Sequence, residues 1–417
     1  MKLPPVTNVT AAAASHLGLK PSPPAGTARI PQPSGKPIPK LFTPLTIRGV
    51  TLPNRIWVGP MAQYSAIDGF HTHWHLAHYG ELVKRGPGLV MVEATAVQAV
   101  GRASPEDAGL YLNGHVDMLE REVDFAHSLG AKIGIQLGHA GRKASTTALP
   151  VSTRDGAKTT ASKEAGGWPD EVFGPTNEPF TDQHPAPRAL TVPELDRVKE
   201  DFVKAAERAV SAGFDIIELH FAHGYLIASF ISPAVNKRQD QYGGNFENRV
   251  RLALEIVQGV RAVIPKTMPL FVRISATDWL ENNPEYEGES WTIKDSVELA
   301  SLLAARGVDV LDVSSGGSHH LQKIKGGLDY QATLAKEIKK QVGNKLLVSA
   351  VGLITSGRQA EDVLLGGQGE NNTPLDLVAV GRGFLKNPGL VWAWAEELDA
   401  PVHMPAQLEW IFTMRKS

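Results

Sequence analysis

The sequence predicts an α/β fold, a (β/α)₈ barrel that forms a single domain with a long insertion after its third strand. Two observations predict it. Eight short runs rich in apolar and β-branched residues recur along the 417 residues, and amphipathic helical patterns lie between them. Continuous apolar strands that alternate with helices indicate a parallel sheet covered on both faces. Eight such units in one chain favour closure into a barrel.

The eight expected strands follow one another along the chain, with the longest interval after the third. They are 55–58, 89–93, 132–136, 214–219, 270–274, 308–313, 346–350 and 375–380. The clearest helical patterns between them span 192–212, 246–263, 292–306 and 333–341. Each strand is a short run without interior proline, as expected for a strand in the interior of a sheet.

Three segments depart from this pattern. Residues 1–40 hold no Asp or Glu, several prolines and an alanine run, a composition that rarely packs into a core, so we expect an N-terminal arm there. We expect the barrel over 41–395 and a C-terminal tail over 396–417. From about 140 to 190 the chain shows little periodicity, and a loop of this length after a barrel strand predicts a cap over the active face.

Composition excludes several classes of protein. Lys and Arg number 42 against 44 Asp and Glu, a net charge of −2 that argues against nucleic-acid binding. No apolar run is long enough to cross a bilayer. The chain has no cysteine, which excludes disulfides, thiolate zinc sites, iron–sulfur clusters and cysteine nucleophiles. We expect a cytoplasmic protein with a small-molecule substrate; a homo-oligomer and a targeting role for the acid-free arm are compatible with these features.

Polar residues cluster just after the predicted strands, where barrel enzymes build their active sites. The first five strands lead into polar and aromatic residues, including 93–95 after strand two and Gln136 in strand three. The last three lead into glycine-rich turns at 314–317, 351–353 and 381–383. Backbone N–H groups can approach an anion closely where no Cβ intervenes, and Arg382 adds a charge, so these turns predict a phosphate site.

His220, His223 and Tyr225 crowd the loop after strand four. Two imidazoles and a phenol suit binding a carbonyl oxygen and delivering a proton. Zinc binding is the rival use of His-x-x-His, although that spacing favours a metal mainly on a helix. A phosphate-binding or metal-dependent lyase or hydrolase that uses these histidines is therefore an alternative function. The other histidine group, at 71, 73, 75 and 78, predicts packing and helix capping.

Arg273 lies inside an apolar strand. A buried unpaired guanidinium is costly, so we expect it to meet a carboxylate or a ligand anion at the barrel mouth. Gln136 occupies an equivalent place on strand three and offers a donor and an acceptor to a planar heterocycle.

One long motif resembles a known family. His220-Phe-Ala-His-Gly-Tyr-Leu226, followed by Phe230-Ile-Ser-Pro233, Asn236, Arg238, Asp240 and Tyr242-Gly-Gly244, resembles the signature of the Old Yellow Enzyme family. The segments at 138–143 and 271–273 are most similar to its thermophilic-like, bacterial-type subgroup. The resemblance spans about 40–389. It implies an ene-reductase on a (β/α)₈ barrel that uses bound FMN and NADPH or NADH to reduce the C=C bond of α,β-unsaturated carbonyl compounds.

The resemblance also implies roles for individual residues. The flavin ring would lie against Gly59, Pro60, Met61, Ala62, Ala94 and Gln136, with Arg273 at its N1/O2 edge. The phosphate would lie against Ser315, Gly316, Gly352, Gly381 and Arg382. His220 and His223 would bind the substrate carbonyl beneath Tyr64, and Tyr225 would supply the proton. In the family the reductant and the substrate use one site in turn, which accounts for the absence of a Gly-x-Gly-x-x-Gly turn.

The sequence departs from the subgroup at two places. Ala62 stands where a cysteine commonly touches the flavin, so we expect an altered flavin potential. Trp410 stands near the place of a tail arginine that commonly reaches a partner subunit, while Arg415 lies further on. A related flavin-barrel oxidoreductase that acts on amines remains a second alternative.

Overall fold

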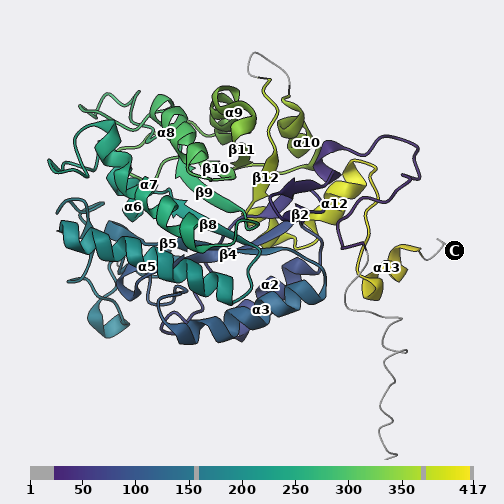
Figure 1. The fold of residues 1–417 in the computed structure, drawn as a ribbon, viewed down its shortest axis with the longest axis horizontal. Coiled ribbons are helices and arrows are strands. Elements are labelled where there is room, and N and C mark those ends of the chain that lie inside the picture. Colours follow the sequence, from purple (N-terminus) through teal and green to yellow (C-terminus); the bar gives the residue numbers. More distant parts are fainter. Residues whose placement is uncertain (1–22, 155–158, 368–371, 414–417) are drawn as a thin grey trace, which may run out of the picture.

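The computed structural model describes residues 23–154, 159–367 and 372–413. Its centre is a closed barrel of eight parallel strands, surrounded by helices (Figure 1). The strands are β3 (Ile56–Val58), β4 (Leu89–Ala96), β5 (Ile133–Gly138), β8 (Ile216–Phe221), β9 (Leu270–Ser275), β10 (Val310–Ser314), β11 (Leu347–Val351) and β12 (Leu377–Val380). β12 pairs with β3 and closes the barrel. The predicted (β/α)₈ fold and all eight predicted strands are confirmed.

An outer layer of helices covers the barrel. It comprises α2 (His73–Val83), α3 (Val116–Ser128), α5 (Val192–Ser211), α7 (Phe246–Val263), α8 (Ile293–Ala305), α9 (Tyr330–Val342), α10 (Gly357–Leu365) and α12 (Leu390–Glu397). The four helices predicted from periodicity are among them. α5 starts where Thr191 and Glu194 form a capping box, which satisfies backbone N–H groups that would otherwise lack partners. The shorter helices are α4 (Leu149–Ser152), α6 (Leu226–Ile231), α11 (Arg382–Lys386) and α13 (Ala406–Thr413).

The barrel interior is filled with side chains. Trp57, Met91, Ile216, Phe271 and Val310 are buried together within it. A hairpin of β1 (Leu45–Ile47) and β2 (Val50–Leu52) packs its apolar residues against this cluster. An apolar plug of this kind leaves only the opposite end of the barrel open for polar chemistry.

The insertion after β5 packs beside the site-bearing loops. It contains α4 and a short parallel pair, β6 (Phe173–Gly174) with β7 (Arg188–Ala189). Val172 is buried against Ala140 and Ala144, and Trp168 and Tyr225 pack on this cluster. The insertion therefore contacts the loop that carries the predicted proton donor.

The described part of the arm lies along the C-terminal segment. The Gly26 N–H donates to the His403 carbonyl (2.9 Å), and Ala28 bridges to Val402. The predicted arm spans residues 1–40, and its first 22 residues lie outside the described residues. In the described ranges no helix combines the length and hydrophobicity that a membrane crossing requires.

Candidate active site

A bulge in β4 arranges the floor of the site. The pairing of β4 with β5 shifts register between Val92 and Ala94, so Glu93 is the extra residue. Ala94 then lies opposite Gln136, which brings these two predicted flavin neighbours together. The Glu93 side chain instead contacts Tyr79 of α2, with the Tyr79 hydroxyl donating to Glu93 Oε2 (3.0 Å). The expectation that all of 93–95 lines the active face is therefore wrong for Glu93.

A buried polar layer lies above the apolar plug. Gln136 Nε2 donates to Glu218 Oε1 (2.7 Å), and Arg273 Nε lies 3.1 Å from Asp312 Oδ2. The prediction that Arg273 meets a carboxylate is confirmed. One guanidinium faces two carboxyl groups here, and burial together with their mutual repulsion raises the pKa of Glu218.

The three residues of the motif after β8 come together at the end of that strand. The ring centroids of His220 and His223 lie 5.1 Å apart, and that of Tyr225 lies 5.0 Å from His220. Burial, with the charges of Arg273 and Lys143, lowers the pKa of His220 to about 3 and that of His223 well below its usual value. Burial raises the pKa of Tyr225. At neutral pH the site therefore holds two neutral imidazoles and a protonated phenol.

His223 is held by contacts that leave one ring nitrogen for a ligand. Its Nε2 lies 2.7 Å from Ser314 Oγ, and its backbone N–H donates to Ser275 Oγ (2.8 Å). Its φ of +60° is in the left-handed region, which non-glycine residues seldom adopt. A ligand can consequently be met only through Nδ1. His220 Nδ1 is buried with no hydrogen-bond partner among the described residues, an orphan that a bound polar group would satisfy.

Lys143 is a site residue that no single position of the sequence indicated. Its Nζ donates to the carbonyl oxygens of His223 (2.7 Å) and Gly317 (2.5 Å), so it ties the loops after β8 and β10 together. Burial, followed by the charge of Arg142, lowers the pKa of Lys143 to about 7. It was visible in the sequence only as part of the 138–143 motif, because its partners are 80 and 174 residues away along the chain.

The glycine-rich turns occupy the other side of the mouth. Gly316 and Gly352 have φ of +71° and +108°, and a Cβ on Gly352 would lie 2.4 Å from Gln331 Nε2. Ser315 Oγ donates to Gln331 Oε1 (2.7 Å), so this predicted phosphate contact has only its backbone N–H to offer. Gly381 precedes α11, whose first residue, Arg382, is exposed.

Closure of the barrel between β12 and β3 brings the loop after β3 next to these turns. The Gly59 N–H donates to the Val380 carbonyl (3.0 Å), and a Cβ on Gly381 would lie 3.4 Å from Met61 Sδ. Pro60, Met61, Ala62 and Tyr64 are all half-buried along this loop. Residues more than 300 positions apart thus line one mouth, as the barrel prediction required. Their contact with a flavin remains a prediction.

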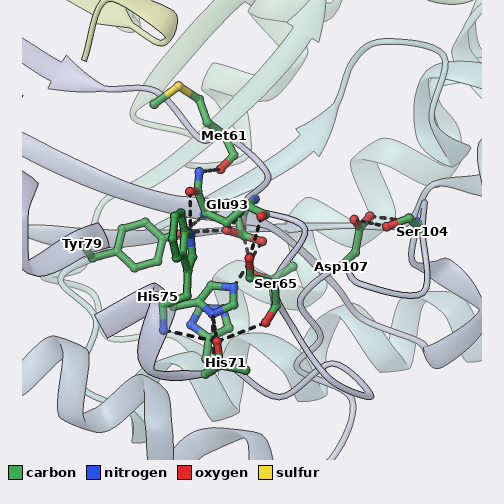
Figure 2. A network of polar contacts seen from close by, with 12 residues as sticks. Met61, Ser65, His71, His75, Tyr79, Glu93, Ser104 and Asp107 are labelled. Atoms are coloured by element: carbon green, nitrogen blue, oxygen red, sulfur yellow. Dashed lines mark hydrogen bonds and ion pairs between the residues drawn. The ribbon is translucent and has the colours of Figure 1, made fainter. Parts of the chain in front are cut away.

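Asp107 adds a buried carboxyl group near the two tyrosines. It accepts hydrogen bonds from Ser104 Oγ (2.9 Å) and from the Ala103 N–H (2.9 Å), and Figure 2 shows the pair with Ser104. Burial raises the pKa of Asp107 to about 6. After burial, its charge is the next cause that raises the pKa values of Tyr64 and Tyr225.

His71 and His75 pack and cap, as predicted, and the His78 ring contacts Tyr79, whereas His73 is exposed. His71 Nδ1 donates to Glu122 Oε1 (2.9 Å), and His75 Nδ1 accepts the Thr72 N–H (3.0 Å) at the start of the helix. Over the described ranges, no group of three or more His, Cys, Asp or Glu side chains could hold a metal ion.

Comparison with known proteins shows what the chain is similar to. Residues 40–400 match the model of the NADH:flavin oxidoreductase / NADH oxidase family. The NADH:flavin oxidoreductase FG08077 of Gibberella zeae is 49% identical over 416 residues, covering 98% of this chain and 97% of that protein. An NADPH dehydrogenase of a Geobacillus species (strain WCH70) is 42% identical over 371 residues, covering 88% and 97%. The solved Old Yellow Enzyme homologue of Zymomonas mobilis superposes with a TM-score of 0.68 at 26% identity, covering 88% and 94%.

Proposed function

Because this chain belongs to the NADH:flavin oxidoreductase / NADH oxidase family, we propose that it is an ene-reductase for α,β-unsaturated carbonyl compounds. It is an oxidoreductase with FMN as cofactor and a nicotinamide as reductant. Because the family is one of flavin-dependent oxidoreductases, we prefer this function to the alternative of a lyase or hydrolase. The observation that carries the proposal is the pair of neutral imidazoles with a protonated phenol at the end of β8.

The residues present fit FMN. Ala94 carries only a methyl group opposite Gln136, Ala62 is small and half-buried, and Arg273 places a positive charge in the barrel mouth. The glycine turns at 316 and 352 offer backbone contacts without intervening side chains. In this assignment Ser315, Gly316, Gly352, Gly381 and Arg382 hold the phosphate, and Gly59, Pro60 and Met61 lie along the ring. When bound, FMN supplies the hydride for the β-carbon of the alkene.

The chain's own residues supply the rest of the chemistry. Negative charge builds on the substrate's carbonyl oxygen during hydride transfer, and N–H donors of His220 and His223 stabilise it. The Tyr225 hydroxyl stays protonated at neutral pH and gives its proton to the α-carbon. Tyr64 lies over the substrate, and Val172 and Trp168 of the insertion pack next to Tyr225 and help to exclude water.

The experiment separates the two half-reactions. Under anaerobic conditions NADPH or NADH should bleach the flavin absorbance, and 2-cyclohexenone should restore it. Tyr225→Phe should keep the bleaching but slow the restoration by about 10²–10⁴-fold, the usual contribution of a general acid. Tyr242→Phe is the matched control, because the Tyr242 hydroxyl contacts Lys199 and Glu255 and not the predicted site.

Three results would refute the proposal. They are a flavin that nicotinamides cannot bleach, a Tyr225→Phe enzyme with unchanged enone turnover, and a flavin that trimethylamine bleaches as an electron donor but that no enone reoxidises. The last result would favour the amine-oxidoreductase alternative.

We also propose that the site is completed within one chain, whether or not the protein assembles into a homo-oligomer. Trp410 on α13 is 57% exposed, and Arg29 forms an ion pair with Glu409 on the same helix. Arg415 lies outside the described residues. Analytical ultracentrifugation over a dilution series would locate any dimer–monomer transition. Turnover per flavin that stays equal across that transition would support this proposal, and turnover that is lost on dissociation would refute it.

A further inference from the structure

The bulged residue Glu93 holds the loop that follows β3. Its side chain is fully buried, and its Oε2 accepts the Gln63 N–H (3.1 Å) and the Tyr79 hydroxyl (3.0 Å). Figure 2 shows Glu93 in the middle of this network, with Met61 above it and His75 and His71 below. A carboxylate reaches the loop only because the bulge turns this residue out of the barrel.

The loop needs such support because Tyr64 is strained. Tyr64 has φ of +50°, in the left-handed region, at a cost of about 1 kcal/mol for a non-glycine residue. Hydrogen bonds fix the residue on either side: the Gln63 N–H is held by Glu93, and the Ser65 carbonyl accepts from Thr72 Oγ1 (3.1 Å). The conformation that carries the Tyr64 side chain is therefore imposed from β4 and from the start of α2.

The neighbouring imidazole presents a proton to the same carboxylate. His75 Nδ1 accepts the Thr72 N–H (3.0 Å), so the ring's proton lies on Nε2. That nitrogen is 3.8 Å from Glu93 Oε1, and the His75 ring stacks on His71 with centroids 4.0 Å apart. His71 in turn donates to Glu122 (2.9 Å). Two buried carboxyl groups thus share this cluster, but only Glu93 contacts the loop.

We propose that Glu93 is a positioning residue, which acts on substrate binding by holding Tyr64 in place through the Gln63 backbone. This inference rests on the proposed function, in which Tyr64 covers the substrate. Glu93 itself lies behind the loop and does not meet the substrate. The bulge turns the carboxylate of Glu93 toward the loop, and the carboxylate holds the loop in the strained conformation of Tyr64.

Glu93→Gln tests the inference at nearly constant volume. Both donors share Oε2, so the amide keeps them only if its carbonyl oxygen takes that place and its NH₂ group faces the Nε2–H of His75. In the other orientation the Gln63 N–H and the Tyr79 hydroxyl both lose their acceptor, and in either orientation the loop loses its bond to a charged group. We expect the KM for 2-cyclohexenone to rise about tenfold, the value of one hydrogen bond to a charged group, while kcat changes little. Glu122→Gln is the matched control: it removes a buried carboxylate of the same cluster and should lower Tm without moving KM.

A double-mutant cycle with Tyr64→Ala separates this inference from the proposed function. If Glu93 acts through Tyr64, Glu93→Gln should have no further effect on KM in the Tyr64→Ala background. Tyr64→Ala with an unchanged KM refutes the substrate role of Tyr64, whereas independent, additive effects refute the positioning role alone. Equal KM changes in Glu93→Gln and Glu122→Gln would also overturn it. If Glu93→Gln does not fold, Tyr79→Phe, which removes one donor to Glu93, should raise KM by a smaller factor, and an unchanged KM there refutes the inference.

Discussion

Ser314 sets which nitrogen of His223 can donate to a substrate. Its Oγ lies 2.7 Å from His223 Nε2 and 3.2 Å from Gln331 Oε1. The single hydroxyl hydrogen of Ser314 can go to Nε2 or to Gln331 Oε1, and Gln331 Oε1 already accepts from Ser315 Oγ (2.7 Å). Its donation to Nε2, at the shorter distance, puts the imidazole proton on Nδ1, the nitrogen that is left to face a ligand. Ser314→Ala removes this selection and leaves Nε2 without its partner. The donor form of His223 must then compete with the other tautomer.

The size of the effect follows from that one contact. A lost hydrogen bond costs about 1 kcal/mol net, and about 3 kcal/mol when a buried group is left unsatisfied. Because each 1.36 kcal/mol is tenfold in rate, kcat/KM for an enone should fall by about 5- to 150-fold. The limiting rate of flavin reduction by NADPH should fall less, since that hydride transfer builds no negative charge on a carbonyl oxygen.

Stopped-flow absorbance of the flavin measures both steps separately. Ser296→Ala is the control, because Ser296 is equally buried but accepts from Trp291 Nε1 (2.7 Å) within α8 and its neighbouring loop. Reoxidation of Ser314→Ala by 2-cyclohexenone at the wild-type rate would refute the reasoning. So would an equal loss in Ser296→Ala.

Three further predictions concern the flavin, acid stability and backbone. Ala62→Cys should shift the flavin's midpoint potential, measured by dye-coupled titration; the same potential in Ala62→Cys and wild type would mean that residue 62 does not touch the ring. His139 is buried and its Nδ1 accepts the Gly141 N–H (3.0 Å), and burial lowers its pKa to about 4. Between pH 6.5 and 4 the unfolded chain therefore binds a proton that the folded chain does not. Acidification through this window should lower the free energy of unfolding by about 3 kcal/mol. Denaturant unfolding at a series of pH values should show a smaller loss in His139→Gln. Gly224→Ala should lower Tm and enone turnover, because its Cβ would lie 2.1 Å from a backbone carbonyl oxygen. Gly244→Ala has a similar positive φ but no atom within 4 Å of its Cβ, so it should lower stability by only about 1 kcal/mol. Equal losses in the two variants would contradict the clash.

Local pattern was enough to predict the barrel and some of the contacts at the ends of its strands. Apolar runs bounded by turns marked every strand, because a strand buried on both faces has no polar side. Alternation along β9 placed Arg273 inside with Phe271, and the cost of burying an unpaired guanidinium predicted its carboxylate partner. The crowding of His220, His223 and Tyr225 on one loop was visible because those residues are close in sequence.

Contacts between distant residues could not be predicted in the same way. Lys143 clamps two loops, Ser314 selects a nitrogen of His223, and Glu93 leaves the barrel at a bulge. A bulge depends on how two strands pair, and neither propensity nor periodicity of one strand shows it. The partner of a side chain in a closed barrel comes from whichever strand the closure places beside it.

The sequence by itself therefore determined the class of fold, the strand ends at which polar residues gather, and the absence of any thiol, including at Ala62 beside the expected flavin. The tertiary structure alone decided how the site is tuned. Burial makes both imidazoles neutral and keeps the phenol protonated, and hydrogen bonds from other strands and helices fix the orientation of His223 and Tyr64. The physical reason is that burial and hydrogen bonding depend on the surroundings of a residue, which exist only once the chain has closed.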